Sequence, residues 1–141
     1  LQESVKGMKK FGLVEWKKHG DNRGGLVAIE GGSDIPFDIR RIFYMDGMER
    51  DTVRAKHANR FSRLVLVPVA GSCKVLVDDG TEREVFDLTK NSAGLLCESM
   101  TWKEIFDFSP DCVLLGISDN IYDPEEYISD YASFRNEVNK D

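Results

Sequence analysis

Short apolar stretches separated by turn-forming residues run through most of this chain and constrain its fold more than any other feature. The clearest hairpin signal is Asp78-Asp79-Gly80, between alternating stretches at 75–77 and 84–86, because Asp-Gly readily adopts the backbone angles of a tight reverse turn. Further strands are expected at 26–30, 39–45, 63–70, 72–77, 93–98, 101–108 and 112–118. Such a series, eight or nine short strands with no helix between them, predicts an all-β closed barrel or double-sheet jelly roll.

A helix is expected only near the C-terminal end of the sequence. Asp123 is a suitable N-cap, Pro124 suits the first helical position, and Glu126 completes a capping box. The following apolar residues form one stripe at helical spacing: Tyr127, Ile128, Tyr131, Phe134 and Val138. We expect this single helix to pack on the barrel or on a second subunit.

The length and composition indicate one domain, which we place at residues 8–141. A chain of 141 residues with 41% hydrophobic residues is large enough for its own core, and no apolar run is long enough to cross a bilayer. Because Met8-Lys9-Lys10 is typical of a natural start, residues 1–7 are expected to be a remnant outside the native chain. The three cysteines are odd in number and form no CxxC pair, which favours buried thiols in the reducing cytoplasm.

The charge distribution favours a small anionic ligand. A net charge of -6 disfavours a general nucleic-acid binder. Residues 38–63, however, include seven basic and four acidic residues, so the net charge of this segment is +3 and that of the remainder is -9. A local basic patch on an acidic protein suits a phosphate or diphosphate better than a polymer.

The stretch from Thr52 to Arg60 concentrates polar and basic side chains around His57. If it forms a strand, alternation places Ala55, His57 and Asn59 on one face and Lys56, Ala58 and Arg60 on the other. His57 and Asn59 would then point the same way into a site. A solvated sheet face is the alternative interpretation of the same pattern.

The residue inventory leaves acid–base chemistry as the expected kind of catalysis. A metal site is not expected, because the chain has only two histidines, His19 lies in a polar run, and Asn59 is a poor ligand for a transition metal. No cofactor is expected either. No nucleophile elbow or recognisable pairing of serine or cysteine with histidine is present in the sequence.

Five motifs, taken in order and spacing, resemble the dTDP-sugar 3,4-ketoisomerases of the cupin superfamily, from about Asp21 to about Phe134. They are Arg41-Ile-Phe-Tyr44, Arg54-Ala-Lys-His57-Ala-Asn59, Gly71-Ser-Cys-Lys-Val-Leu-Val-Asp-Asp-Gly80, Trp102-Lys-Glu104 with Asp107-Phe-Ser109, and Tyr122-Asp with Glu126-Tyr127. The resemblance implies a cupin-type jelly roll that forms a homodimer, often with exchanged strands. It also implies a metal-independent isomerase that moves the keto group of dTDP-4-keto-6-deoxyglucose from C4 to C3.

Two departures from the family pattern fall in its active-site motifs. The family usually carries H-A-H where this chain has His57-Ala-Asn59, and W-H-E where it has Trp102-Lys103-Glu104. The resemblance implies that His57 is the base, and an imidazole with a pKa near neutrality suits that role. Asn59 can donate a hydrogen bond to an enediolate oxygen but cannot exchange a proton. Tyr44 is the remaining titratable candidate, as a shuttle for the oxygen proton; a half-buried core tyrosine is the alternative.

The expected substrate-binding residues are mostly cations, since a diphosphate requires cationic partners. The set is Arg23, Arg41, Arg54, Lys56, Arg60, Trp102 and Lys103. Alternative roles are a loop brace for Arg23, surface charges for Arg41, Arg54 and Lys56, a core position for Trp102 and a solvated sheet edge for Lys103.

Two functions of different classes follow. The first is an isomerase of a dTDP-linked 4-keto-6-deoxyhexose, working in deoxyamino-sugar biosynthesis for surface glycans. The second is a sugar-nucleotide binding protein that kept the pocket and lost the reaction. A 3,5-epimerase is a weaker third, because its His-Asp pair cannot be placed in the sequence. No nucleic acid or membrane is expected as a partner.

Overall fold

In the computed structural model, which describes residues 9–90 and 93–139, two five-stranded sheets enclose a common interior. One sheet has the order β1-β9-β6-β11-β4 and the other the order β12-β5-β10-β7-β8, and all the pairings between neighbours are antiparallel. The strands of the first sheet are β1 (Phe11–Val14), β4 (Arg41–Met45), β6 (Leu64–Ala70), β9 (Gly94–Cys97) and β11 (Val113–Ser118). Those of the second are β5 (Arg54–Asn59), β7 (Ser72–Asp78), β8 (Arg83–Thr89), β10 (Trp102–Phe106) and β12 (Tyr127–Ile128). The predicted all-β, cupin-type double-sheet fold is confirmed.

The turn chemistry of the sequence accounts for much of this arrangement. The predicted Asp78-Asp79-Gly80 turn joins β7 to β8, and Gly80 has a φ of 92°, a conformation that favours glycine. Pro68 lies next to a register shift, where Val113 pairs with Ala70 but Leu114 pairs with Pro68, so that Val69 is bulged.

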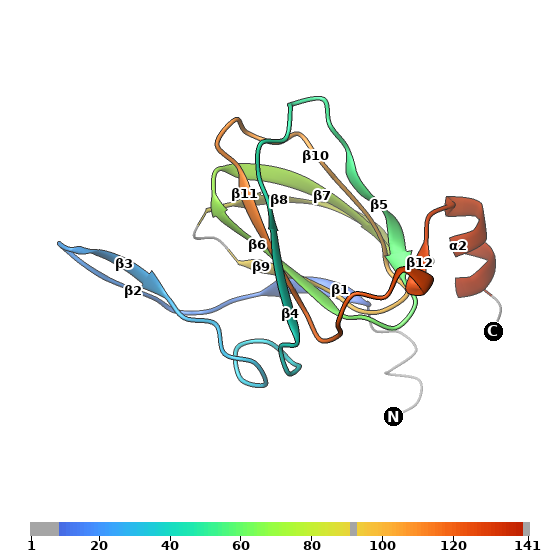
Figure 1. Ribbon diagram of the computed structural model, residues 1–141, viewed down its shortest axis with the longest axis horizontal. Coiled ribbons are helices and arrows are strands. Elements are labelled where there is room, and N and C mark those ends of the chain that lie inside the picture. Colours follow the sequence, from blue (N-terminus) through green and yellow to red (C-terminus); the bar gives the residue numbers. More distant parts are fainter. Residues whose placement is uncertain (1–8, 91–92, 140–141) are drawn as a thin grey trace.

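A third, two-stranded sheet forms an arm outside the barrel. Its strands are β2 (Lys18–Asp21) and β3 (Gly24–Val27), joined by a tight turn. Figure 1 shows this arm extending away from the barrel on the side opposite the C-terminal helix. Nearly every residue of the arm is exposed. His19, in the polar run noted above, lies in β2 and is exposed.

The predicted single C-terminal α-helix is confirmed, but it begins later than expected, because the segment after Asp123 divides into three elements. They are a 3-10 turn η1 (Pro124–Glu126), the short strand β12, and the helix α2 (Tyr131–Val138). Asp123 does cap η1, but Tyr127 and Ile128 pair with the edge of β5, and Asp130 caps α2 by accepting from the Ser133 amide. Strand pairing satisfies the backbone of an otherwise open sheet edge, and this outweighs the local helix signal.

The predicted capping box is wrong. The carboxylate of Glu126 is buried and accepts from the backbone and hydroxyl of Ser62 instead of the η1 backbone. No helix in the described part of the chain is both long and apolar enough to span a membrane. The expectation for residues 1–7 lies outside the described residues.

The space between the sheets is filled unevenly, and this positions the site. One end holds the main apolar core, which includes Leu66 from β6, Val75 from β7, Ile105 from β10 and Leu114 from β11. A smaller cluster of Ala58, Trp102, Ile128 and Phe134 lies between the second sheet and α2. At the other end of the interior, the inward-facing positions of β4, β5, β10 and β11 carry polar side chains around a cavity.

Candidate active site

The cavity has a volume of about 280 Å³ and opens between the two sheets. Its polar lining includes Arg41 from β4, Arg54, His57 and Asn59 from β5, and Lys103 from β10. Apolar residues of the barrel, among them Phe43, Leu66 and Ile105, close its inner end. A concave, largely apolar space with a few converging polar groups is typical of a small-molecule site.

A β-bulge in β5 sets the position of His57. Lys103 pairs with His57, but the next residue of β10, Glu104, pairs with Ala55, so Lys56 has no partner across the strands. Ala55 and Lys56 both have positive φ, 69° and 55°, which is uncommon for residues with a side chain. Strain of this kind concentrates at functional sites, and here it precedes His57 directly.

The bulge also determines which nitrogen of His57 faces the cavity. The imidazole Nδ1 lies 3.0 Å from the carbonyl oxygen of Ala55. A carbonyl only accepts, so Nδ1 carries the proton and Nε2 is left as the basic nitrogen. The ring of Tyr127 packs edge-on against the imidazole, with centroids 4.7 Å apart, and restricts its rotation.

The surroundings of His57 keep it neutral. Burial, followed by the Lys103 cation, lowers the pKa of His57 from 6.5 to about 4, against opposing effects of the Ala55 hydrogen bond and the Glu126 carboxylate. A neutral imidazole at physiological pH can accept a proton from a substrate carbon. The prediction that His57 and Asn59 share a face is confirmed, because both line the cavity.

The structure contradicts the alternative role given above for Lys103, a solvated sheet edge. Its side chain is only 2% exposed, because β10 lies between β5 and β7 and Lys103 points into the barrel. Its Nζ donates to Asn59 Oδ1 at 2.9 Å and to the Thr101 carbonyl at 3.3 Å. Lys103 was predicted to bind substrate, and the structure places it directly behind Asn59.

The other predicted binding residues divide into two groups. Arg41 and Arg54 line the cavity, and the Arg41 guanidinium lies over the rings of Phe43 and Tyr122, at 4.8 and 5.2 Å from their centroids. Neither arginine has a carboxylate partner among residues 9–90 and 93–139. Both are therefore available to an anion.

Four of the predicted binding residues do not line the cavity. Lys56 is exposed in the bulge. Arg60 is bound to Glu137 of α2 and to the Glu125 carbonyl. Trp102 packs under α2, and its indole N–H donates to Glu104. This agrees with the alternative role given for Trp102, a core residue. Arg23 lies on the arm, paired with Asp21 at 2.6 Å.

Strand alternation acts against the proton-shuttle role predicted for Tyr44. Tyr44 borders the cavity, but Arg41, Phe43 and Met45 occupy the inner face of β4, and the Tyr44 side chain is 67% exposed on the outer face. The sequence showed this alternation without showing which face was internal. The phenol in contact with His57 is Tyr127. The sequence pattern placed Tyr127 on the apolar stripe of the predicted helix and not in the site, because the strand β12 that positions it was predicted as helix.

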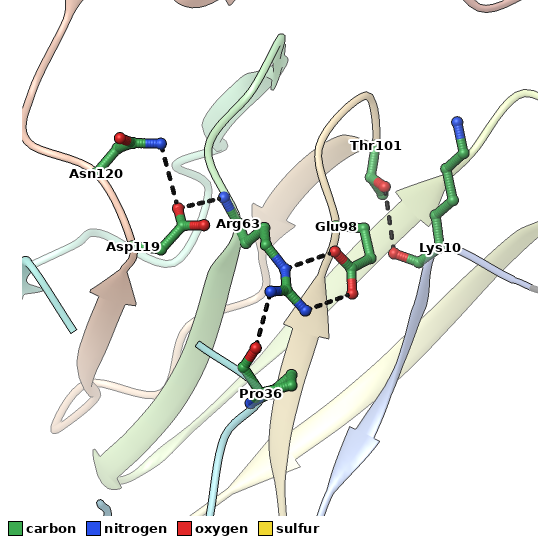
Figure 2. Close-up of polar contacts among 7 residues, drawn as sticks. All are labelled: Lys10, Pro36, Arg63, Glu98, Thr101, Asp119 and Asn120. Atoms are coloured by element: carbon green, nitrogen blue, oxygen red, sulfur yellow. Dashed lines mark hydrogen bonds and ion pairs between the residues drawn. The ribbon is translucent and has the colours of Figure 1, made fainter. Parts of the chain in front are cut away.

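Part of the basic segment has a structural role. Figure 2 shows Arg63 with its guanidinium held by both Glu98 carboxylate oxygens and by the Pro36 carbonyl, while its backbone amide donates to Asp119. These bonds tie the start of β6 to the loops around it. Arg63 therefore contributes no free charge to the cavity.

No group of three or more His, Cys, Asp or Glu side chains in the described ranges is placed to hold a metal ion. What the cavity does contain is a neutral imidazole, an amide, a buried ammonium and two arginines. The fold and this set of groups define a class: a cupin-like jelly-roll enzyme with an acid–base site for a small anionic substrate.

Comparison with known proteins specifies the class further. Residues 9–139 match the FdtA family, described as WxcM-like, C-terminal. The TDP-4-oxo-6-deoxy-alpha-D-glucose-3,4-oxoisomerase of Aneurinibacillus thermoaerophilus is 37% identical over 128 residues, which cover 91% of this chain and 92% of the relative.

Solved structures agree with this match. A mutant of the 3,4-ketoisomerase QdtA from Thermoanaerobacterium thermosaccharolyticum, in complex with TDP-4-keto-6-deoxyglucose, superposes with a TM-score of 0.90 at 33% identity, covering 94% of this chain and 96% of that one. WlaRA, the TDP-fucose-3,4-ketoisomerase of Campylobacter jejuni, gives 0.88 at 32% identity, with 94% and 98% covered. The chain belongs to the dTDP-sugar 3,4-ketoisomerase family.

Proposed function

We propose that the protein moves the keto group of a dTDP-linked 4-keto-6-deoxyhexose from C4 to C3, with His57 as the base. The observation that carries this proposal is the His57 imidazole, partly buried at the cavity wall, with Nδ1 bonded to the Ala55 carbonyl and Nε2 free. Family membership and the relatives' activity support the same reaction.

The reaction is an enolisation followed by its reversal on the neighbouring carbon. His57 Nε2 takes the proton from C3, the C3–H electrons form the C3–C4 double bond, and the C4 carbonyl electrons move onto its oxygen. A proton then passes from the C3 hydroxyl to the C4 oxygen. Delivery of a proton to C4, as the C3 oxygen becomes a carbonyl and the His57 imidazolium gives up the proton it took, completes the isomerisation without net oxidation.

Asn59 and the arginines stabilise charge in this scheme. The Asn59 amide donates to the developing enediolate oxygen, as expected for a preorganised donor in a site that excludes water. Arg41 and Arg54, which have no carboxylate partner in the described part of the chain, bind the diphosphate at the wall of the cavity. A cavity of about 280 Å³ is at the small end for ligand sites and suits the hexose, with the nucleotide outside it.

The working form is proposed to be a homodimer with exchanged arms. Among the described strands, β2 and β3 pair only with each other. Leu26 on this arm, like Ile42 on β4 and Val69 on β6, is a large apolar side chain exposed to solvent. An exchanged arm would cover such surface and would bring Arg23 to the partner. We also propose a cytoplasmic location, supported by the three free cysteines, and a role in deoxyamino-sugar synthesis, because a 3-keto group is what an amination at C3 requires.

The test is incubation with dTDP-4-keto-6-deoxyglucose in deuterated water, followed by NMR. The wild type should form the 3-keto product and incorporate deuterium, and His57→Asn should lose both while dTDP binding is nearly unchanged. His19→Asn, the same substitution at the exposed histidine, is the matched control and should be active. Wild-type binding of dTDP without product or exchange would reject the isomerase and select the binding protein.

A further inference from the structure

Lys103 is a buried cation with no carboxylate partner among the described residues. Its two hydrogen-bond acceptors are neutral: the Asn59 amide oxygen and the Thr101 carbonyl. Packing alone does not explain a lysine here, since burial penalises the ammonium form and lowers the pKa of Lys103, and an apolar side chain of similar length would fill the space without that cost.

We propose that Lys103 is a positioning residue, which holds the Asn59 amide with its N–H groups toward the substrate and keeps a positive charge behind it. The inference rests on the proposed function, because the oxygen that Asn59 serves is that of the enediolate. It assigns Lys103 a role distinct from direct substrate binding.

The orientation of the amide follows from hydrogen-bond chemistry. An ammonium group only donates, so the Asn59 atom that faces Nζ at 2.9 Å is the amide oxygen. The amide nitrogen then faces away from Lys103, and Asn59 lines the cavity. Without the ammonium the amide is free to rotate by half a turn and present its oxygen, which would repel an oxyanion. Lys103 thus makes Asn59 a dependable donor.

The position of Lys103 also affects His57. The two residues pair across β5 and β10, so a positive charge on Lys103 opposes protonation of the imidazole and favours an anionic intermediate between them. The other charged or titratable groups that face His57 are Glu126 of η1, whose carboxylate favours the imidazolium, Tyr127 of β12, and the cavity arginines Arg54 of β5 and Arg41 of β4.

Two variants separate the effects of charge and orientation. Lys103→Met keeps an unbranched side chain and removes both the charge and the donor, whereas Lys103→Gln removes the charge and keeps an N–H donor for Asn59. We expect kcat to fall on the order of a hundredfold in Lys103→Met, the loss typical of one oxyanion donor, and less in Lys103→Gln, with dTDP affinity nearly unchanged in both. In both, the acid limb of kcat/KM and the His57 NMR titration should move to higher pH.

A double-variant cycle tests whether Lys103 acts through Asn59. The double variant, Lys103→Met with Asn59→Ala, should have nearly the same kcat as Asn59→Ala alone, when both are measured at a pH above the acid limb. Fully additive losses, or a Lys103→Met enzyme with wild-type kcat and an unmoved His57 titration, would overturn the proposal.

The NMR titration needs no substrate, so it distinguishes failure of this inference from failure of the proposed function. If the wild type proves inactive but the His57 titration still moves in Lys103→Met, the isomerase fails and the electrostatic role of Lys103 stands. If Lys103→Met does not fold, the same two measurements on Lys103→Gln decide the matter, because that variant also removes the charge.

Discussion

The acid limb of the pH–rate profile is the most direct test of how the fold tunes His57. Burial and the Lys103 cation lower the pKa of His57 to about 4, and kcat/KM reports the free enzyme's essential base. At pH 5.5 an ordinary imidazole would be about one-tenth neutral, whereas His57 would be almost entirely neutral. We therefore expect kcat/KM to be nearly constant from neutrality to about pH 5 and to fall only near pH 4.

The assay is kcat/KM for dTDP-4-keto-6-deoxyglucose at half-unit steps of pH, with the His57 ring resonance titrated in parallel. Both measurements should place the His57 pKa near 4, well below the 6.5 of an ordinary imidazole. A half-maximal rate and a resonance midpoint near 6.5 would refute the reasoning, because His57 would then be behaving as a solvated imidazole.

The same pKa shift predicts a dependence of stability on pH. The unfolded chain binds a proton at His57 below about pH 6.5, while the folded chain does so only near pH 4. Between these values the unfolded state holds more protons, so the free energy of unfolding falls as the pH falls, by at most about 1.4 kcal/mol per pH unit from this group. Compared with the wild type, His57→Asn should lose this component of the slope, which denaturant melts at pH 7 and pH 5 would measure.

Further predictions concern metal dependence, assembly, the bulge and the amide. Activity should be complete after exhaustive chelation, and loss that a divalent ion restores would contradict the mechanism. Sedimentation should give a dimer at micromolar concentration; a monomer would count against arm exchange. Lys56→Gly should raise the free energy of unfolding by roughly 1 kcal/mol by relieving the positive φ, whereas Ala58→Gly, in the regular part of β5, should lower it. Asn59→Ala should slow the reaction on the order of a hundredfold with the acid limb in place, since an amide does not titrate.

Local patterns in the sequence determined most strands of the barrel, the β7–β8 turn and the shared face of His57 and Asn59, but not β1, β2 or β12. These features depend on two-residue alternation and on the backbone preferences of glycine, aspartate and proline, which act over a few neighbouring residues. Because these preferences act only between near neighbours, they also explain why the helix predicted directly after Asp123 does not form there. The caps and apolar spacing after Asp123 describe a helix correctly as an isolated segment, but only the folded protein contains the β5 edge that recruits Tyr127 and Ile128.

Only the tertiary structure decided which face of each strand is internal and which side chains meet across strands. Alternation separates Tyr44 from Arg41 and Phe43, but the barrel determines that Tyr44 faces outward. Lys103 resembles a surface lysine until β10 is placed between two other strands. The reason is physical: burial and charge proximity set the pKa values and hydrogen bonds of this site, and both depend on contacts such as Asn59 with Lys103, which lie 44 residues apart in the chain.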